Sequence, residues 1–114
     1  MVARLFEFIW LPSFERDAKK LLSEDDRRAI EERLCEDLEA GQVMERTGGF
    51  RKLRHPRPGM GKRGGLRVVY LKDEGRGIVY MALVYAKADK ESMTREEERQ
   101  LRRLAHTILS GDDQ

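Results

Sequence analysis

The segment LRVVYLKDEGRGIVYMALVYA, residues 66–86, decides the fold of this chain. Two runs rich in β-branched and aromatic residues, Leu66 to Leu71 and Ile78 to Ala86, are separated by a polar run that contains two glycines. This pattern predicts a β-hairpin, because such runs favour strands and glycine favours the turn between them. An antiparallel sheet is therefore expected at the centre of the fold.

Two further strands are predicted on the N-terminal side of this hairpin. Ala3 to Trp10 alternates roughly between apolar and polar residues and carries aromatic residues that favour strands. Phe50 to Arg54 forms a short strand after the turn at 47–49. The run from His55 to Gly65 is rich in glycine, proline and basic residues, and is expected to be a loop.

Two helices are predicted between the first and second strands. Pro12 suits the first turn of a short helix, because its fixed φ is compatible with that position. Ser23 and Asp26 have the spacing of a capping-box variant that opens a second helix, for which Gly41 is the expected stop. The apolar residues at helical spacing are Phe14, Ala18, Leu21 and Leu22 in the first helix, and Ile30, Leu34 and Leu38 in the second.

A last helix follows the hairpin. Thr94 and Glu97 have the spacing of a capping box, and apolar residues recur after them at helical spacing up to Leu109. The whole order predicts an α+β fold, with a small antiparallel sheet of about four strands, two N-terminal helices and a C-terminal helix. Without a linker or an internal repeat, residues 1–114 are expected to form a single domain.

The net charge of +2 conceals a strongly basic central stretch. Residues 46–72 contain nine lysines and arginines and no acidic residue, whereas the segments on either side are net acidic. Such a stretch favours binding to a polyanion, since phosphate neutralisation dominates affinity for nucleic acids. The alternative is a basic loop that is merely solvated.

The sequence lacks the signatures of several other functions. No apolar run approaches the ~18 residues of a membrane span, and no signal peptide is recognisable, so a membrane association is not expected. Cys35 is the only cysteine, which is typical of a protein in the reducing cytoplasm. His55 and His106 do not have zinc-site spacing, and the glycine motif at 59–64 precedes a strand rather than a helix. No metal or other cofactor is therefore expected.

Basic residues lie at corresponding places on the predicted strands. Lys52 and Arg54 must share one face of their strand while Leu53 points to the other, because side chains alternate. Arg67 begins the next strand, and Lys87 follows the last one. If these strands are neighbours, the four cations line one patch; the alternative is that each reaches solvent separately at its strand end.

The segments GGFRKLRHPRPGMGKRGGLRVVY, residues 48–70, and YAKADKESMT, residues 85–94, resemble the RelE/HigB-like toxins of bacterial toxin–antitoxin systems. The resemblance implies a RelE-like fold over nearly the whole chain. It also implies that Lys52 and Arg54 are paired active-site cations, that Arg67 holds the scissile phosphate, and that a basic residue follows the last strand, for which Lys87 is the catalytic candidate. The further basic residues expected to bind RNA are Arg51, Arg57, Lys62, Arg63 and Lys90.

The chain departs from the family pattern after its last strand. Ala88 falls where the family has an arginine, so Lys87 or Lys90 must substitute, and no tyrosine follows Tyr85. Tyr85 and His55 are further candidates for a stacking or acid–base role. An inactive relative of the family is the alternative that these departures leave open.

The resemblance implies an endoribonuclease that enters the ribosomal A site and cleaves mRNA there, neutralised by a cognate antitoxin, often a helix-turn-helix protein of the HigA type. Cleavage without metal would proceed by attack of the ribose 2′-OH on the adjacent phosphate, with fixed cations stabilising the transition state. Arg67 would clamp the phosphate, Lys52 would stabilise charge or act as the base, and Arg54 or Lys87 would assist the leaving oxygen.

Two other functions are compatible with the same sequence. A ParE-like gyrase inhibitor would use the same fold, but it needs no phosphate-cleaving cations. A non-catalytic RNA-binding module would need exposed aromatic residues that stack on bases. The aromatic residues available are instead expected in the core or on strands: Phe50, Tyr70, Tyr80 and Tyr85.

Overall fold

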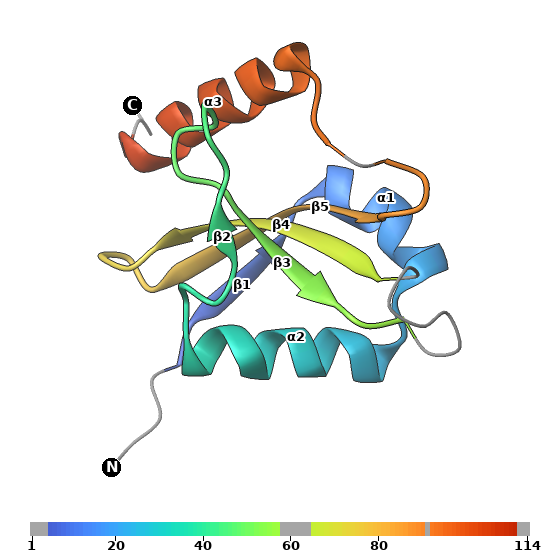
Figure 1. Cartoon of the computed structure of the whole chain (residues 1–114). Helices are drawn as coiled ribbons and strands as arrows, with labels where there is room; N and C mark the ends of the chain where they lie inside the picture. Colours follow the sequence, from blue (N-terminus) through green and yellow to red (C-terminus); the bar gives the residue numbers. More distant parts are fainter. Residues whose placement is uncertain (1–4, 58–64, 91, 112–114) are drawn as a thin grey trace.

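The structure, a computed structural model, describes residues 5–57, 65–90 and 92–111; these form a five-stranded sheet with helices on both faces (Figure 1). The strand order across the sheet is β1-β5-β4-β3-β2. The strands are β1 (Glu7–Trp10), β2 (Gln42–Val43), β3 (Arg51–His55), β4 (Leu66–Asp73) and β5 (Ile78–Ala86), and the helices are α1 (Pro12–Leu21), α2 (Glu24–Glu36) and α3 (Arg95–Leu109).

The predicted hairpin is confirmed as the antiparallel pair β4–β5 at the centre of the sheet. The α+β prediction is also confirmed, but the sheet is mixed rather than antiparallel, because β1 runs parallel to β5. It has five strands instead of about four, since β2 pairs with β3 at one edge. The two residues of β2 form no apolar run, so no hydropathy pattern could have predicted it.

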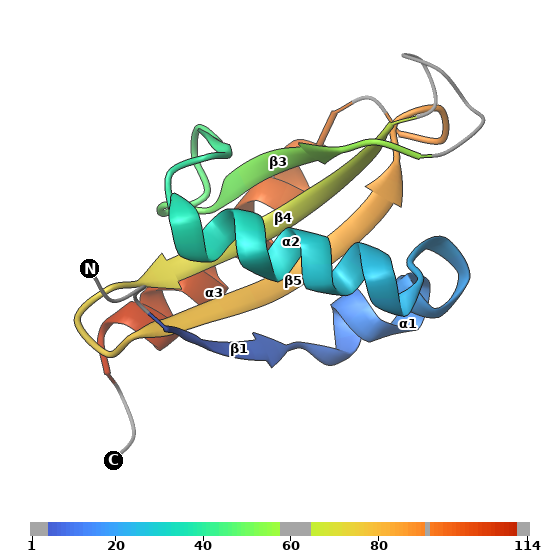
Figure 2. The same cartoon turned by 90° about the horizontal axis from the view of Figure 1, so that it is seen from below.

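The helices divide between the two faces of the sheet. Figures 1 and 2 show α2 crossing one face beside α1, with α3 on the opposite face. Phe14 of α1 and Leu34 of α2 pack with Leu53 and Val68 of the sheet in one buried cluster. Leu101 of α3 packs on the other side in a second buried cluster, with residues such as Phe50, Val69 and Leu71. We call these surfaces the α2 face and the α3 face.

The helix starts agree with the predicted caps. Ser23 and Asp26 form a complete capping box at α2, and Thr94 and Glu97 form another at α3. The predicted stop of the second helix was wrong: α2 ends at Glu36, and Gly41 lies beyond it. A Cβ on Gly41 would come within 2.9 Å of the backbone of β3, so this glycine allows the chain to pass close to the sheet. No helix in the described part is long and apolar enough to cross a membrane.

Candidate functional site

Strand register brings the predicted catalytic residues of β3 and β4 together. Arg54 lies directly opposite Arg67, which lies opposite Tyr85 of β5. Directly opposite residues project from the same face of a sheet, so these three side chains form a row across three strands. Lys52 lies two residues from Arg54, opposite Val69, and therefore on the same α3 face.

Lys87 lies at the end of the same row of strands. Its backbone N–H donates to the carbonyl oxygen of Gly65 (3.0 Å), which extends the β4–β5 pairing one step beyond Leu66 and Ala86. The chain at Lys87 is thus adjacent to the start of the strand that carries Arg67. We use the name basic cluster for Lys52, Arg54, Arg67 and Lys87.

Arg67 is the buried member of the basic cluster. The residue is 8% exposed, and its Nη1 donates to the carbonyl oxygen of Leu66 (3.3 Å). The guanidinium folds back towards Gly65, since a Cβ added there would lie 3.2 Å from this Nη1. Gly65 is also the residue whose carbonyl oxygen accepts from Lys87. Within the described residues Arg67 has no carboxylate partner. A buried cation of this kind is stabilised by a bound anion, which would supply the missing counter-charge.

Tyr85 completes the row with a buried hydroxyl. Its hydroxyl oxygen is buried and has no hydrogen-bond partner among the described residues. Burial raises the pKa of Tyr85; the charge of Arg67 opposes this effect and that of Glu97 adds to it. The phenol therefore stays protonated near neutral pH and can donate one hydrogen bond. An unsatisfied buried hydroxyl costs free energy, which a ligand acceptor would recover.

The β3 members of the basic cluster are fixed through their backbone. Arg33 of α2 donates from Nη1 to the carbonyl oxygen of Arg54 (2.9 Å), which anchors β3 from the opposite face. The side chains of Lys52 and Arg54 make no ion pair within the described ranges, and Arg54 is exposed. Their charges are thus available to a ligand, unlike those of most arginines in the helices.

The residues expected to bind RNA do not all lie near the basic cluster. Arg51 lies away from it: this residue alternates with Lys52 and projects to the α2 side like Leu53, and its Nη1 donates to the carbonyl oxygen of Gly41 (2.7 Å). Lys90 forms an ion pair with Glu97 at the start of α3. Arg57 is half-buried just beyond β3. Lys62 and Arg63 lie outside the described residues.

The loop prediction at His55 is wrong. This residue was expected in a loop, but it is the last residue of β3 and only 8% exposed. Its Nε2 lies 3.0 Å from Oδ1 of Asp26 in α2. The hydrogen bond with His55 is the largest of the causes that hold the pKa of Asp26 below its ordinary value. His55 therefore belongs to the α2 face and is not part of the basic cluster.

The chemistry available on the α3 face is that of an anion site. Two guanidinium groups and an ammonium group share this face with a neutral phenol, a set that matches the oxygens of a phosphodiester. Among the described residues there is no group of three or more histidines, cysteines and acidic residues that could hold a metal ion. What the basic cluster itself can supply is fixed positive charge.

The comparison with protein families decides which fold family this is. Residues 4–114 match the model of the RelE toxin of the RelE/RelB toxin–antitoxin system. The chain belongs to the RelE toxin family. This RelE-family chain is also similar to a solved structure of the E. coli toxin RelE in the free state, a mutant with two arginines replaced by alanine. The TM-score is 0.54 at 15% identity, over 76% of this chain and 88% of that one, and the likeness concerns the fold.

Family membership confirms the resemblance seen in the sequence. As a member of the RelE family, the chain is a toxin of the toxin–antitoxin type. The sequence signal for Lys52, Arg54 and Arg67 was strand alternation, which the register bears out as a shared face. The same alternation, applied to Arg51, would have separated that residue from the other three.

Proposed function

We propose that this RelE-family chain, acting as a single domain over residues 1–114, is a ribosome-dependent mRNA endoribonuclease of the HigB-like branch. The observation that carries the proposal is the row Arg54–Arg67–Tyr85 across three strands, with Lys52 beside it on the same face. Arg67 is buried without a carboxylate partner in the described part of the chain, which suits a residue whose counter-charge is a phosphate.

In the proposed reaction the ribose 2′-oxygen attacks the adjacent phosphorus. The new O–P bond forms as the bond from phosphorus to the 5′-oxygen breaks, giving a 2′,3′-cyclic phosphate and a 5′-hydroxyl end. Arg67 holds the non-bridging oxygens and balances the charge that grows on them. Lys52 either stabilises this charge while water takes the 2′-OH proton or, as a neutral amine, takes that proton itself. The departing 5′-oxygen takes a proton from the ammonium group of Lys87, or from water while Arg54 stabilises its negative charge.

The proposed partners follow from family membership. A toxin of this type has a cognate antitoxin, which we propose to be a helix-turn-helix protein of the HigA type. The proposed target is mRNA on the ribosome, and the proposed site of action is the cytoplasm. The basic stretch 46–72 supports a polyanionic target, because its charge favours the phosphate backbone.

The test is cleavage of a short mRNA on purified ribosomes, read by mapping the new 5′ ends. We expect Arg67→Ala to lower the single-turnover rate by about 100-fold or more, the usual effect of removing one stabilising group from a transition state. Arg28→Ala is the matched control, since Arg28 is an exposed arginine on α2 that pairs with Asp25 (3.3 Å). It should cleave at the parental rate, and circular dichroism should show both variants folded.

Other outcomes would decide against the proposal. If Arg67→Ala cleaves as fast as the parent, the role of Arg67 is wrong. If the parent leaves mRNA intact while its expression causes DNA breaks and filamentation, the chain is a gyrase inhibitor. If it binds RNA without cutting it and is not toxic, it is a binding module.

A further inference from the structure

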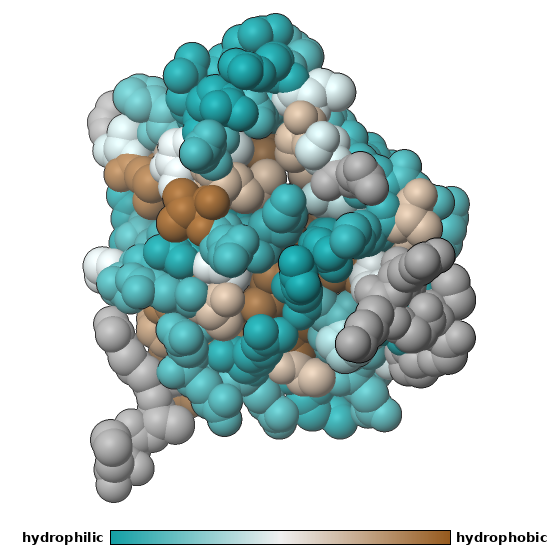
Figure 3. Space-filling model, in the orientation of Figure 1, coloured by the Kyte–Doolittle hydropathy of each residue, from teal (hydrophilic) through white to brown (hydrophobic). Residues whose placement is uncertain are grey.

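A groove opens next to Lys52, between the segment around β2 and the start of α3. Its volume is about 660 Å³, within the range of about 300–1,000 Å³ typical of small-ligand sites. In the space-filling view a hydrophobic patch lies on the β2 side below α3, within a mainly hydrophilic surface (Figure 3). We call this space the α3 groove; its lining residues are 42–46, Lys52, 92–95 and Glu98.

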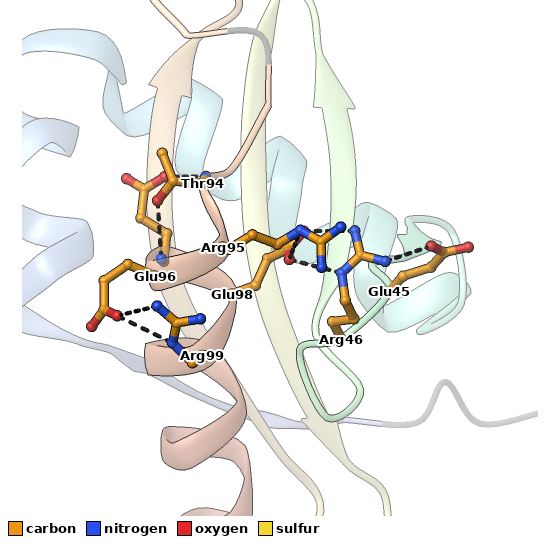
Figure 4. Close-up of polar contacts among 8 residues, drawn as sticks. Glu45, Arg46, Thr94, Arg95, Glu96, Glu98 and Arg99 are labelled. Carbon is orange, nitrogen blue, oxygen red and sulfur yellow. Dashed lines mark hydrogen bonds and ion pairs between the residues drawn. The ribbon is translucent and has the colours of Figure 1, made fainter.

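One wall of the α3 groove is held in a strained conformation. Arg46 has a φ of 65°, which is unusual for a residue other than glycine. Its guanidinium donates two hydrogen bonds to the carboxylate of Glu98 in α3, from Nε to Oε1 (2.8 Å) and from Nη2 to Oε2 (3.1 Å). Figure 4 shows the guanidinium groups of Arg46 and Arg95 both lying beside the carboxylate of Glu98. Such strain persists where the surroundings impose it, and it clusters at ligand sites.

Hydrogen bonds to the neighbouring backbone also fix the wall that contains Arg46. Thr47 is fully buried, and its hydroxyl donates to the carbonyl oxygen of Met44 (2.8 Å). The backbone N–H of Met44 in turn donates to the carbonyl oxygen of Phe50 (2.9 Å). On the opposite side, the capping box of Thr94 and Glu97 fixes the first turn of α3. The α3 groove is therefore formed before any ligand binds, which lowers the entropic cost of binding.

The lining combines apolar and cationic groups in a way that suits a nucleotide. Met44 and Met93 are half-buried and pack against the core of the α3 face. Thioethers make favourable contacts with aromatic rings, and bases present such ring faces. Lys52, Arg46 and Arg95 supply three cations against two carboxylates, so the lining has an excess of positive charge. This excess favours an anionic ligand. A nucleotide suits the lining better than an acidic peptide segment of equal size, because its flat base can also stack on the methionines.

We propose that the α3 groove binds one nucleotide of the RNA strand next to the cleaved bond, and that it thereby sets the base preference of the toxin. The inference rests on the proposed function in one respect: Lys52 belongs both to the basic cluster and to the lining of the groove, so a strand held at the cluster continues into it. Met93 stacks on the base, and Arg95 contacts the flanking phosphate.

The first test does not depend on cleavage. The ¹⁵N-labelled chain is titrated with each of the four ribonucleoside 5′-monophosphates, and amide shifts are followed by NMR. We expect saturable shifts concentrated at residues 42–46 and 93–98, with different affinities for different bases. Met93→Ala and Arg95→Gln should each weaken binding by about fivefold or more, the effect of losing a contact worth roughly 1 kcal/mol.

A matched control is available on α3 itself. Arg103 is 67% exposed and lies 3.8 Å from Glu96, much as Arg95 is 73% exposed and lies 3.8 Å from Glu98, but Arg103 does not line the α3 groove. Arg103→Gln should bind mononucleotides as the parent does. Shifts confined to the strands of the basic cluster, no shifts at all, or equal weakening by Arg95→Gln and Arg103→Gln would each overturn the proposal.

The second test uses the ribosome assay with mRNAs that vary the bases flanking the cleaved bond. Met93→Ala should flatten the base preference while still cleaving, whereas Arg67→Ala should lose the rate at all sites. An unchanged preference in Met93→Ala would contradict the subsite. If the parent does not cleave at all, the proposed function fails, and the mononucleotide titration still decides whether the groove is a nucleotide site.

Discussion

The two faces of the sheet differ in whether their buried polar groups have partners. On the α2 face, polar side chains that point inward are paired: His55 with Asp26, and the Tyr70 hydroxyl with the backbone of the segment after α2. On the α3 face, the described residues include a buried arginine without a carboxylate and a half-buried tyrosine whose buried hydroxyl has no partner. One face is therefore complete without a ligand, while the other has polar groups that a ligand would satisfy.

This difference is built into single strands. In β3, Leu53 is 1% exposed and belongs to the core of the α2 face, whereas its neighbours Lys52 and Arg54 lie on the α3 face. Alternation allows one strand to stabilise the fold with one side chain and to present charge with the next. A substitution at Leu53 should consequently affect mainly stability, whereas one at Lys52 or Arg54 should affect mainly activity.

The largest expected effect comes from that adjacent pair. Leu53→Ala should lower the free energy of unfolding by about 2–5 kcal/mol, because it leaves a cavity in a closely packed core. Lys52→Ala should change it by less than about 0.5 kcal/mol, as for an ordinary half-exposed residue, but should lower cleavage on ribosomes by about 100-fold. Urea unfolding and the cleavage assay measure the two quantities separately. Equal loss of stability in both variants would remove the distinction between the faces.

A smaller effect should distinguish the two buried tyrosine hydroxyls, those of Tyr70 and Tyr85. The Tyr70 hydroxyl donates to the carbonyl oxygen of Leu38 (2.8 Å) and accepts from the N–H of Gly41 (3.0 Å). Tyr70→Phe leaves both groups unsatisfied and should cost about 1–3 kcal/mol of stability. Tyr85→Phe breaks no bond within the described structure and should raise stability by about 1 kcal/mol. Matched chemical denaturation curves measure this difference, and a destabilised Tyr85→Phe would mean that its hydroxyl is already satisfied.

The smallest expected effect concerns the pH dependence of the α2 face. His55 and then the backbone of Ser23 hold the pKa of Asp26 below its ordinary value of 3.8. Since the pKa is lower in the folded chain, the unfolded chain takes up the proton first as the pH falls. The stabilisation is thus full above the unfolded pKa and is lost as the pH falls through the folded pKa.

Asp26→Asn removes this proton uptake. Its unfolding free energy should therefore fall less steeply than that of the parent between about pH 5 and about pH 3. The comparison with the parent matters, because other carboxylates with lowered pKa values, such as Glu15 and Glu97, contribute equally to both chains. Parallel curves for the two proteins would show that the pairing with His55 adds no pH-dependent stability.

Most of the fold could be predicted because its signals are local. The capping residues predicted where α2 and α3 begin, and the strand-forming residues of β4 and β5 predicted the hairpin. The order of strands is a different matter, since the parallel pairing of β1 with β5 joins distant segments and leaves no local trace. The strand β2 exists because it pairs with β3, so its own composition did not reveal it.

The candidate site was predictable only as far as alternation reaches. Lys52 and Arg54 followed from the position of Leu53, but Arg51 was grouped with them by charge alone and lies on the α2 face. The lining of the α3 groove was not foreseen. Arg46 and Arg95 meet there because α3 packs over the end of the β2–β3 connection, and tertiary packing of this kind has no sequence motif.

The parallel pairing of β1 also affects how the chain is made. Directly after β1, the hydroxyl of Ser13 donates to the carbonyl oxygen of Ala82, 69 positions later in the sequence (2.6 Å). β1 must therefore stay unpaired until β5, the last strand of the described sheet, has been synthesised, and such a topology slows folding. Because β5 also supplies Tyr85 and leads into Lys87, a chain synthesised only as far as β4 has neither a paired β1 nor the full set of candidate-site residues. Translation itself thus sets the earliest moment at which the sheet and the candidate site can be completed.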